Sequence, residues 1–268
     1  MRSEEFSTRA LWPEGGNAAP RDLKRHVAWL RVLAAIGLLA ARLAYGAAQV
    51  LPVAAFSAHA PGGALPEEWM PYGFENIKSR TSYALVRDGS RTVLRAEAKS
   101  SASGLLRKLK ADPAEYPLLR WSWKVSGVVK NADLYRKDGD DFSARIYVIF
   151  DYPLEKLSFV ERAKVKLAKL VYGAELPLAT LCYVWDAKAP VGTIAPSAYT
   201  DRVRIVVVES GPDRANQWVD FERDVRRDFL AAFGEAPPAI TGIALATDTD
   251  NTGTAVSALY GDITINKQ

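Results

Sequence analysis

Residues 240–265 read ITGIALATDTDNTGTAVSALYGDITI, and this stretch decides the expected fold. Ile243 and Leu245 alternate with smaller residues and lead into an acidic turn at 248–251, and a second alternating run begins at Val256. A period of two is typical of a strand whose two faces have different surroundings. We therefore expect two strands joined by an acidic turn, packed into sheets that the rest of the chain supplies.

The same alternation recurs upstream and is clearest in residues 118–125, where large apolar residues alternate with Arg120, Ser122 and Lys124. Trp121 and Trp123 share the apolar face, which predicts a place in the core. Further strands are expected at 83–87, 92–98, 104–110, 142–150, 180–187, 202–209 and 218–222.

Two segments break the β pattern. Residues 154–171 have apolar residues at helical spacing with basic residues between them, and residues 224–233 form a second helical pattern that ends at Gly234. Many short strands with few helices predict a mainly β protein, an antiparallel β-sandwich of jelly-roll type with peripheral helices at about 154–171 and 224–233.

The first part of the chain has the composition of a leader. In residues 1–48 a basic cluster precedes an apolar segment at 32–41, and small residues follow up to Ala48. This order predicts a cleaved signal and a periplasmic or secreted protein; a membrane anchor is the alternative, although the apolar run is shorter than the ~20 residues of a spanning helix. Proline and glycine predict a linker at 49–64, which leaves 65–268 as a single β-sandwich domain.

Composition excludes several classes of chemistry. Cys182 is the only cysteine, so no internal disulfide forms, and its strand-like setting predicts a small buried hydrophobe. His26 and His59 both precede the predicted domain, which argues against His-dependent triads and His-rich metal sites. The net charge of +4, with basic and acidic residues interleaved, argues against a nucleic-acid partner. The chain has no Gly-rich phosphate loop, G-x-S-x-G or Cys-x-x-Cys motif.

Several segments occur together in one order: YPLLRWSWKV, RKDGDDFSARIYVIFD, LCYVW, YTDRVRIVVVESG, QWVDFERDVRRDFLAAFGEAPPAITGIALATDTDNTG and LYGDI. In this combination the chain resembles the bacterial family called domain of unknown function 3047, over roughly residues 65–266. That family implies no established activity and no catalytic residue. At the level of the fold, YPLLRWSWKV and the closing LYGDITI are similar to galactose-binding-like jelly rolls and to carbohydrate-binding modules of that shape.

Two acidic turns are candidates for a binding site. Short Asp and Asn clusters supply the hard oxygen ligands that Ca²⁺ prefers, but the same residues also close turns by hydrogen-bonding their own backbone, which is the favoured interpretation. Neither turn has EF-hand spacing. The candidate Ca²⁺ ligands, from the second turn and the last strand, are Asp248, Asp250, Asn251 and Asp262.

The first acidic turn and neighbouring strands supply candidates for ligand binding. Arg145 and Tyr147 lie on one face of the 142–150 strand, as alternation alone would often place them. Trp185 and Trp218 could stack on a sugar ring. The candidate ligand-binding residues are Asp138, Asp140, Asp141, Arg145, Tyr147, Trp185 and Trp218.

The leading functional hypothesis is an exported module that binds a glycan or another component of the cell envelope, with no catalytic residue assigned. One alternative is a carboxylate- or Tyr/Arg-based polysaccharide hydrolase or lyase, which would need suitably spaced side chains across a cleft. The other is a structural envelope protein. The basic helix at 154–171 could contact an anionic membrane, but a helix with its basic face in water is preferred.

Overall fold

The computed structural model describes residues 50–268 except 74–76, 160–161 and 164–177. The predicted signal in residues 1–48 therefore lies outside the described residues. Among the helices of the described part, none combines the length and the apolar character needed to cross a membrane.

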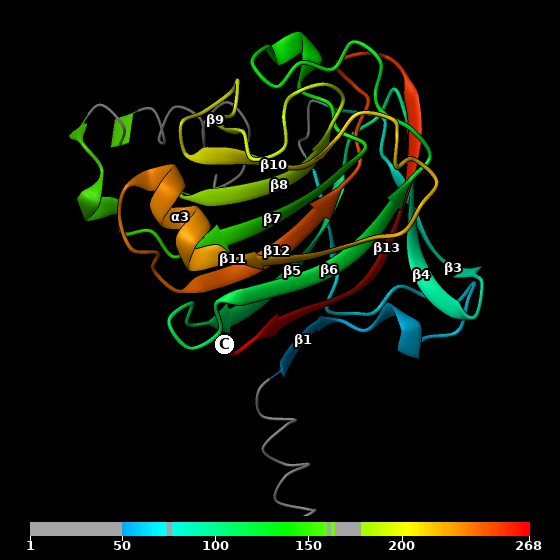
Figure 1. Ribbon diagram of the computed structural model, residues 1–268, viewed down its shortest axis with the longest axis horizontal. Coiled ribbons are helices and arrows are strands. Elements are labelled where there is room, and N and C mark those ends of the chain that lie inside the picture. Colours follow the sequence, from blue (N-terminus) through cyan, green and yellow to red (C-terminus); the bar gives the residue numbers. More distant parts are fainter. Residues whose placement is uncertain (1–49, 74–76, 160–161, 164–177) are drawn as a thin grey trace, which may run out of the picture. The chain divides into compact units, whose positions relative to one another are not determined.

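The described chain forms two sheets (Figure 1). The strands of the six-stranded sheet, called sheet A, are β1 (Val50–Ala54), β3 (Ser82–Asp88), β4 (Arg91–Lys99), β6 (Leu118–Val125), β11 (Val219–Asp224) and β13 (Ala255–Asn266). The strands of the seven-stranded sheet, called sheet B, are β2 (Met70–Tyr72), β5 (Gly104–Ala111), β7 (Ala144–Phe150), β8 (Thr180–Asp186), β9 (Ile194–Pro196), β10 (Val203–Ser210) and β12 (Ile240–Ala246).

The spatial order of the strands mixes distant parts of the chain. Sheet A runs β11-β6-β13-β4-β3, with β1 paired to β13, and sheet B runs β2-β5-β12-β7-β8-β10-β9. The strands β12 and β13, which enclose the second acidic turn, belong to different sheets, so this turn crosses from one layer to the other. The predicted β-sandwich of jelly-roll type is confirmed.

One strand pair departs from the antiparallel expectation. β8 and β10 are parallel, with register from Val203↔Thr180 to Ser210↔Asp186. Parallel neighbours need a long connection, and the connection here includes β9, which pairs antiparallel with β10 at the edge. The edge strands β9 and β2 have three residues each, and each contains a proline, Pro196 and Pro71.

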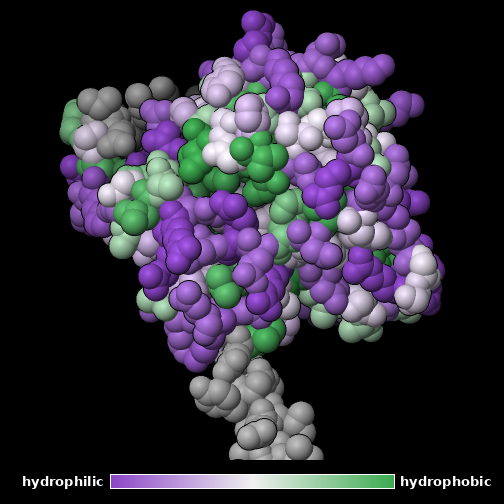
Figure 2. Space-filling view, viewed as in Figure 1, coloured by the Kyte–Doolittle hydropathy of each residue, from purple (hydrophilic) through white to green (hydrophobic). Residues whose placement is uncertain are grey.

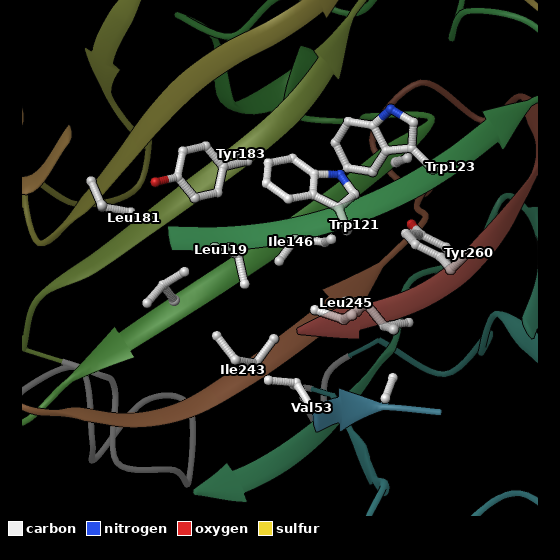
Figure 3. Packing of buried hydrophobic residues seen from close by; sticks show 14 of the residues in the cluster. Val53, Leu119, Trp121, Trp123, Ile146, Leu181, Tyr183, Ile243, Leu245 and Tyr260 are labelled. Atoms are coloured by element: carbon white, nitrogen blue, oxygen red, sulfur yellow. The ribbon is translucent and has the colours of Figure 1, made fainter. Parts of the chain in front are cut away.

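The core lies between the sheets, where the alternation of β6 buries one face. Trp121 is 3% exposed and Trp123 is 0% exposed, as predicted. Figure 3 shows both indoles between Tyr183 of β8 and Tyr260 of β13. The ring centroids are 5.3 Å apart for Trp121–Tyr183 and 6.4 Å apart for Trp123–Tyr260. Truncating such a buried aromatic residue to alanine costs about 3–5 kcal/mol. These side chains join sheets A and B into one core.

The prediction of a linker at 49–64 is wrong for its first half. β1 pairs with the end of β13, and a 3-10 helix, Phe56–Ala58, follows. Val53 and Phe56 are both 0% exposed and belong to the main core. Proline made this segment resemble a linker, but Pro52 lies in a strand paired on one side, where a missing N–H is tolerated.

One predicted helix is present as α3, Val225–Phe233, seen beside the sheets in Figure 1. Asp224 caps it by accepting two backbone N–H groups of the first turn, at 3.0 and 3.1 Å, and Gly234 ends it with a φ of 79°. Phe229 packs on Phe150 of β7, with ring centroids 4.6 Å apart.

The helix predicted at 154–171 lies largely outside the described residues. Its described start is a 3-10 helix, Leu154–Lys156, followed by Leu157 in an extended conformation. Leu157 is 2% exposed, and Lys156 forms an ion pair with Glu235 at 2.8 Å, so this start is attached to the sandwich. Both the preferred interpretation, a basic face in water, and the alternative contact with a membrane concern residues that lie mostly outside the described part.

Candidate functional site

The two acidic turns meet at one end of sheet B. The first precedes β7, and the second joins β12 to β13. Asp141 of the first turn is 0% exposed, and its carboxylate accepts the backbone N–H groups of Asn251 at 3.3 Å and Thr252 at 2.6 Å. The Asp141 carboxylate of the first turn therefore holds the backbone of the second turn in place by hydrogen bonds.

Arg145 of β7 is the cation of this cluster and is only 5% exposed. Its Nε donates to Asp248 Oδ1 at 3.0 Å, and its Nη2 donates to Asp248 Oδ2 and to the carbonyl of Asp140, the latter at 2.7 Å. The backbone N–H of Phe142 also donates to Asp248 Oδ1, at 2.9 Å. Asp248 is thus held from two sides, by a guanidinium and by the backbone of the first turn.

The acidic groups are crowded as well as buried. One oxygen from each of Asp141, Asp248 and Asp250 lies within 4.8 Å of the others. Burial raises the pKa of Asp248 to about 7, although Arg145 opposes the shift. Burial, followed by the charge of Asp141, raises the pKa of Asp250. The cluster holds more negative charge than Arg145 can balance.

The Arg145 and Tyr147 pair does not support lyase chemistry. Arg145 is committed to Asp248 and Asp140. Tyr147 packs against a second apolar cluster on the outer face of sheet B, which includes Cys182. Burial raises the pKa of Tyr147 well above its usual value, which opposes its use as a base.

Two other predicted ligand-binding residues are placed apart from the cluster. Asp138 is exposed on the same loop and forms an ion pair with Arg136 at 2.6 Å. Trp185 is 1% exposed, and its Nε1–H donates to the carbonyl of Gly211 at 2.9 Å. This burial corrects the expectation that Trp185 stacks on a sugar, because its face lies in the core.

Asp262 and Trp218 lie with sheet A, away from the acidic turns. Asp262 on β13 accepts the backbone N–H of Ser57 at 2.9 Å and its hydroxyl at 2.5 Å, and is not part of the carboxylate group around Asp248. Trp218 immediately precedes β11 and is half-buried. Its Nε1–H donates to Asp88 Oδ2 at 2.7 Å, and the Arg91 guanidinium lies 4.0 Å from the ring centroid.

A groove of about 430 Å³ crosses β11, β6 and β13 on sheet A. Cross-strand register pairs Asp220 with Ser122 and Glu222 with Arg120, which places these polar side chains together on the outer face. Figure 2, in the same view as Figure 1, shows a face on which hydrophilic residues surround several hydrophobic patches. The lining residues are Arg91, Arg120, Trp121, Ser122, Asp220, Phe221, Glu222, Asp262 and Thr264.

Gly261 sets the shape of the groove beside Ser122. A Cβ at Gly261 would lie 2.3 Å from Ser122 Oγ, which is closer than atoms can approach. The register of β13 against β6 shifts between Tyr260 and Ile263, and Asp262 within this irregular stretch is exposed. No local sequence pattern indicates the groove, because its strands are far apart in the chain; the signal that the sequence does carry is the outward alternation of polar residues.

The fold and these surfaces define the class of protein, a two-layer β-sandwich of jelly-roll type with a polar groove on one sheet and a buried acidic cluster at the end of the other. The chain belongs to the family described as "Protein of unknown function (DUF3047)", whose model matches residues 67–264. No curated protein matches the chain.

Several solved structures are similar over most of the chain. The family 30 carbohydrate-binding module of the cellulosomal cellulase Cel9D-Cel44B of Clostridium thermocellum is 13% identical, covers 82% of this chain and 98% of that chain, and has a TM-score of 0.39. The native family 12 xyloglucanase from Bacillus licheniformis is 10% identical, with coverages of 81% and 100% and a TM-score of 0.40. The carbohydrate recognition domain of Emp47p is 11% identical, with coverages of 82% and 98% and a TM-score of 0.41. No ligand or activity is transferred from them.

Proposed function

We propose that the protein is a glycan-binding module and that the groove on sheet A is its ligand surface. The observation that carries the proposal is the row of guanidinium, carboxylate and hydroxyl side chains on adjacent strands, close to the half-buried Trp218. Sugars offer many hydroxyl groups that both donate and accept hydrogen bonds, and apolar ring faces that pack on aromatic side chains. A groove with these groups fits such a ligand.

Little free energy is needed to release the polar side chains of the groove from their present partners so that they can bind a ligand. Arg120 and Glu222 form an ion pair at 2.5 Å, but their side chains are 54% and 50% exposed. Exposed pairs of this kind contribute about 0–1 kcal/mol, so ligand hydroxyls can replace the pair with little penalty. Trp218 is held by Asp88 and Arg91, so a ligand that packs on it does not have to immobilise it.

The test is retention of the full chain by a panel of soluble polysaccharides, with product release measured in parallel. We expect Trp218→Ala and Asp220→Asn to weaken binding about tenfold each, because lost aromatic packing or a lost hydrogen bond to a charged group costs about 1.4 kcal/mol or more. The matched control is Tyr199→Ala, which removes a 48% exposed aromatic outside the groove and should change affinity less than twofold.

Each outcome has a meaning for the proposal. Binding that is lost in Tyr199→Ala but kept in Trp218→Ala and Asp220→Asn would place the site at the acidic turns, since Asn251 Nδ2 donates to Tyr199 Oη at 3.1 Å. Product release would favour the carboxylate-based hydrolase, with Asp220, Glu222 and Asp262 as candidates in the groove. If the protein neither retains any polysaccharide nor releases products, the glycan-binding proposal is overturned and a structural role in the envelope is left.

We also infer that the protein is exported, with residues 1–48 as its leader. The support is the order of basic, apolar and small residues described above. Cell fractionation with N-terminal sequencing tests it: a periplasmic or secreted chain that begins near residue 49 is the expected result. An uncut chain in the membrane fraction would favour the anchor, and an uncut chain in the cytoplasm would overturn both.

A further inference from the structure

Asp140 has a buried carboxylate oxygen that lacks a hydrogen-bond donor. The residue is 7% exposed, and within the described part of the chain its Oδ1 accepts no hydrogen bond. Arg145 Nη1 lies 3.6 Å away, beyond hydrogen-bond range, and Arg145 Nη2 donates to the Asp140 carbonyl instead. An unsatisfied buried carboxylate oxygen is costly, so this atom needs a further partner.

The orphan oxygen is linked to the crowded carboxylates through Arg145. Arg145 Nη1 lies 3.6 Å from Asp140 Oδ1, and Arg145 Nη2 donates to Asp248 Oδ2. Asp140 of the first acidic turn and Asp248 of the second therefore flank the same guanidinium. Asp140 and Asp248 share the guanidinium of Arg145, and Asp141 and Asp250 add their carboxylates within 4.8 Å of that of Asp248. Like charges that are buried together need protons or a cation between them.

We propose that a calcium ion binds where the two acidic turns meet, with carboxylate oxygens of Asp140, Asp141, Asp248 and Asp250 as its ligands. The donor set selects the metal: all the groups are hard oxygens, which suit Ca²⁺, whereas Zn²⁺ and Cu²⁺ prefer imidazole or thiolate. Ca²⁺ also tolerates irregular ligand geometry with added water, while Mg²⁺ demands a near-ideal octahedron. Asp250 is half-buried and gives the ion access from solvent.

The protein holds these ligands in place before the ion arrives. Asp141 is fixed by the N–H groups of Asn251 and Thr252, and Asp248 by Arg145 and the N–H of Phe142. A carboxylate oxygen has two lone pairs, so an oxygen that accepts one hydrogen bond can still bind a metal. Both Asp141 oxygens and Asp248 Oδ2 accept one bond each, whereas Asp248 Oδ1 already accepts two. Arg145 acts as a positioning residue that orients Asp248, and little rearrangement opposes binding.

The experiment is calorimetric titration of the chelator-treated full chain with CaCl₂, combined with thermal unfolding. We expect one Ca²⁺ per chain and a Tm that rises with CaCl₂ and returns after addition of EGTA, because a ligand of the folded state stabilises it. Asp250→Asn should weaken the affinity at least tenfold. The matched control is Asp138→Asn, in an exposed residue of the first turn that pairs with Arg136, and it should stay within twofold.

Asp250→Asn is the main variant because its half-exposed side chain makes misfolding less of a risk than at the buried Asp141. The wild-type titration needs no variant. A folded protein that binds no Ca²⁺ at millimolar concentration would overturn the proposal, as would equal affinity for Mg²⁺ or equal loss in Asp138→Asn and Asp250→Asn. Calcium binding without polysaccharide retention would support the calcium site and overturn only the glycan proposal. Retention without calcium binding would overturn the calcium site and support glycan binding.

Discussion

The reactivity of a single side chain in this protein depends on how deeply the two sheets bury it. Cys182 on β8 is 1% exposed, and burial raises the pKa of its thiol to about 12. The strand pattern around it predicted a small buried hydrophobe, and the structure agrees. A thiol that stays protonated is a poor nucleophile, so this residue serves packing.

We predict that Cys182 resists thiol reagents at pH 8 in the folded protein and reacts within minutes in denaturant, which a chromogenic disulfide reagent measures. The folded pKa lies above the ordinary value of 9.0, so the protonated thiol stabilises the fold fully below about pH 9. That contribution is lost as the pH rises toward 12. Rapid labelling of native protein at pH 8 would contradict the burial of this side chain.

The sequence indicates the residue types of the candidate site but not which of them interact. Both acidic turns are visible in it, yet Arg145 and Asp248 are 103 positions apart, and no local pattern links them. It could not separate Trp185 from Trp218, because alternation alone does not tell which face of a strand meets the other sheet. Asp262 lies apart from the carboxylate group of the acidic turns and instead accepts hydrogen bonds from Ser57, which is 205 positions away in the chain.

Whole elements were predicted more reliably, and β1 is the informative exception. Proline and glycine around β1 indicate a linker, whereas β1 stabilises the fold by pairing with β13 at the far end of the chain. β6 was found because its period of two is complete over Leu118–Val125. The groove could not be predicted from the sequence, because it depends on the spatial order β11-β6-β13, which local patterns do not encode.

We predict that a chain shortened to begin at Leu65 is less stable than one that begins at Gln49 by at least about 3 kcal/mol, because it loses a buried Phe56 and the ladder between β1 and β13. Urea unfolding followed by circular dichroism measures the difference. Phe56→Ala in the longer chain should reproduce much of the loss, whereas Ser57→Ala, which keeps the apolar contacts, should cost about 1 kcal/mol. Equal stability of the two chains would restore the linker interpretation.

For the sandwich as a whole, the main core includes inner-face residues of both sheets, so neither sheet can keep its packing without the other. We predict that residues 49–268 unfold in one transition, with the same midpoint by far-ultraviolet circular dichroism and by tryptophan fluorescence. Trp123 reports on sheet A and Trp185 on sheet B, and both contribute to the fluorescence signal. Two separate midpoints would mean that the sheets are independent units.

The short edge strands have a consequence for behaviour at high concentration. An unpaired strand normally invites a neighbouring molecule to add its own strand and so begin a fibre. Both outer borders of sheet B are three residues long, and proline removes a backbone donor from each. These short borders, each with a proline, would keep copies of the protein from polymerising through this sheet at high concentration.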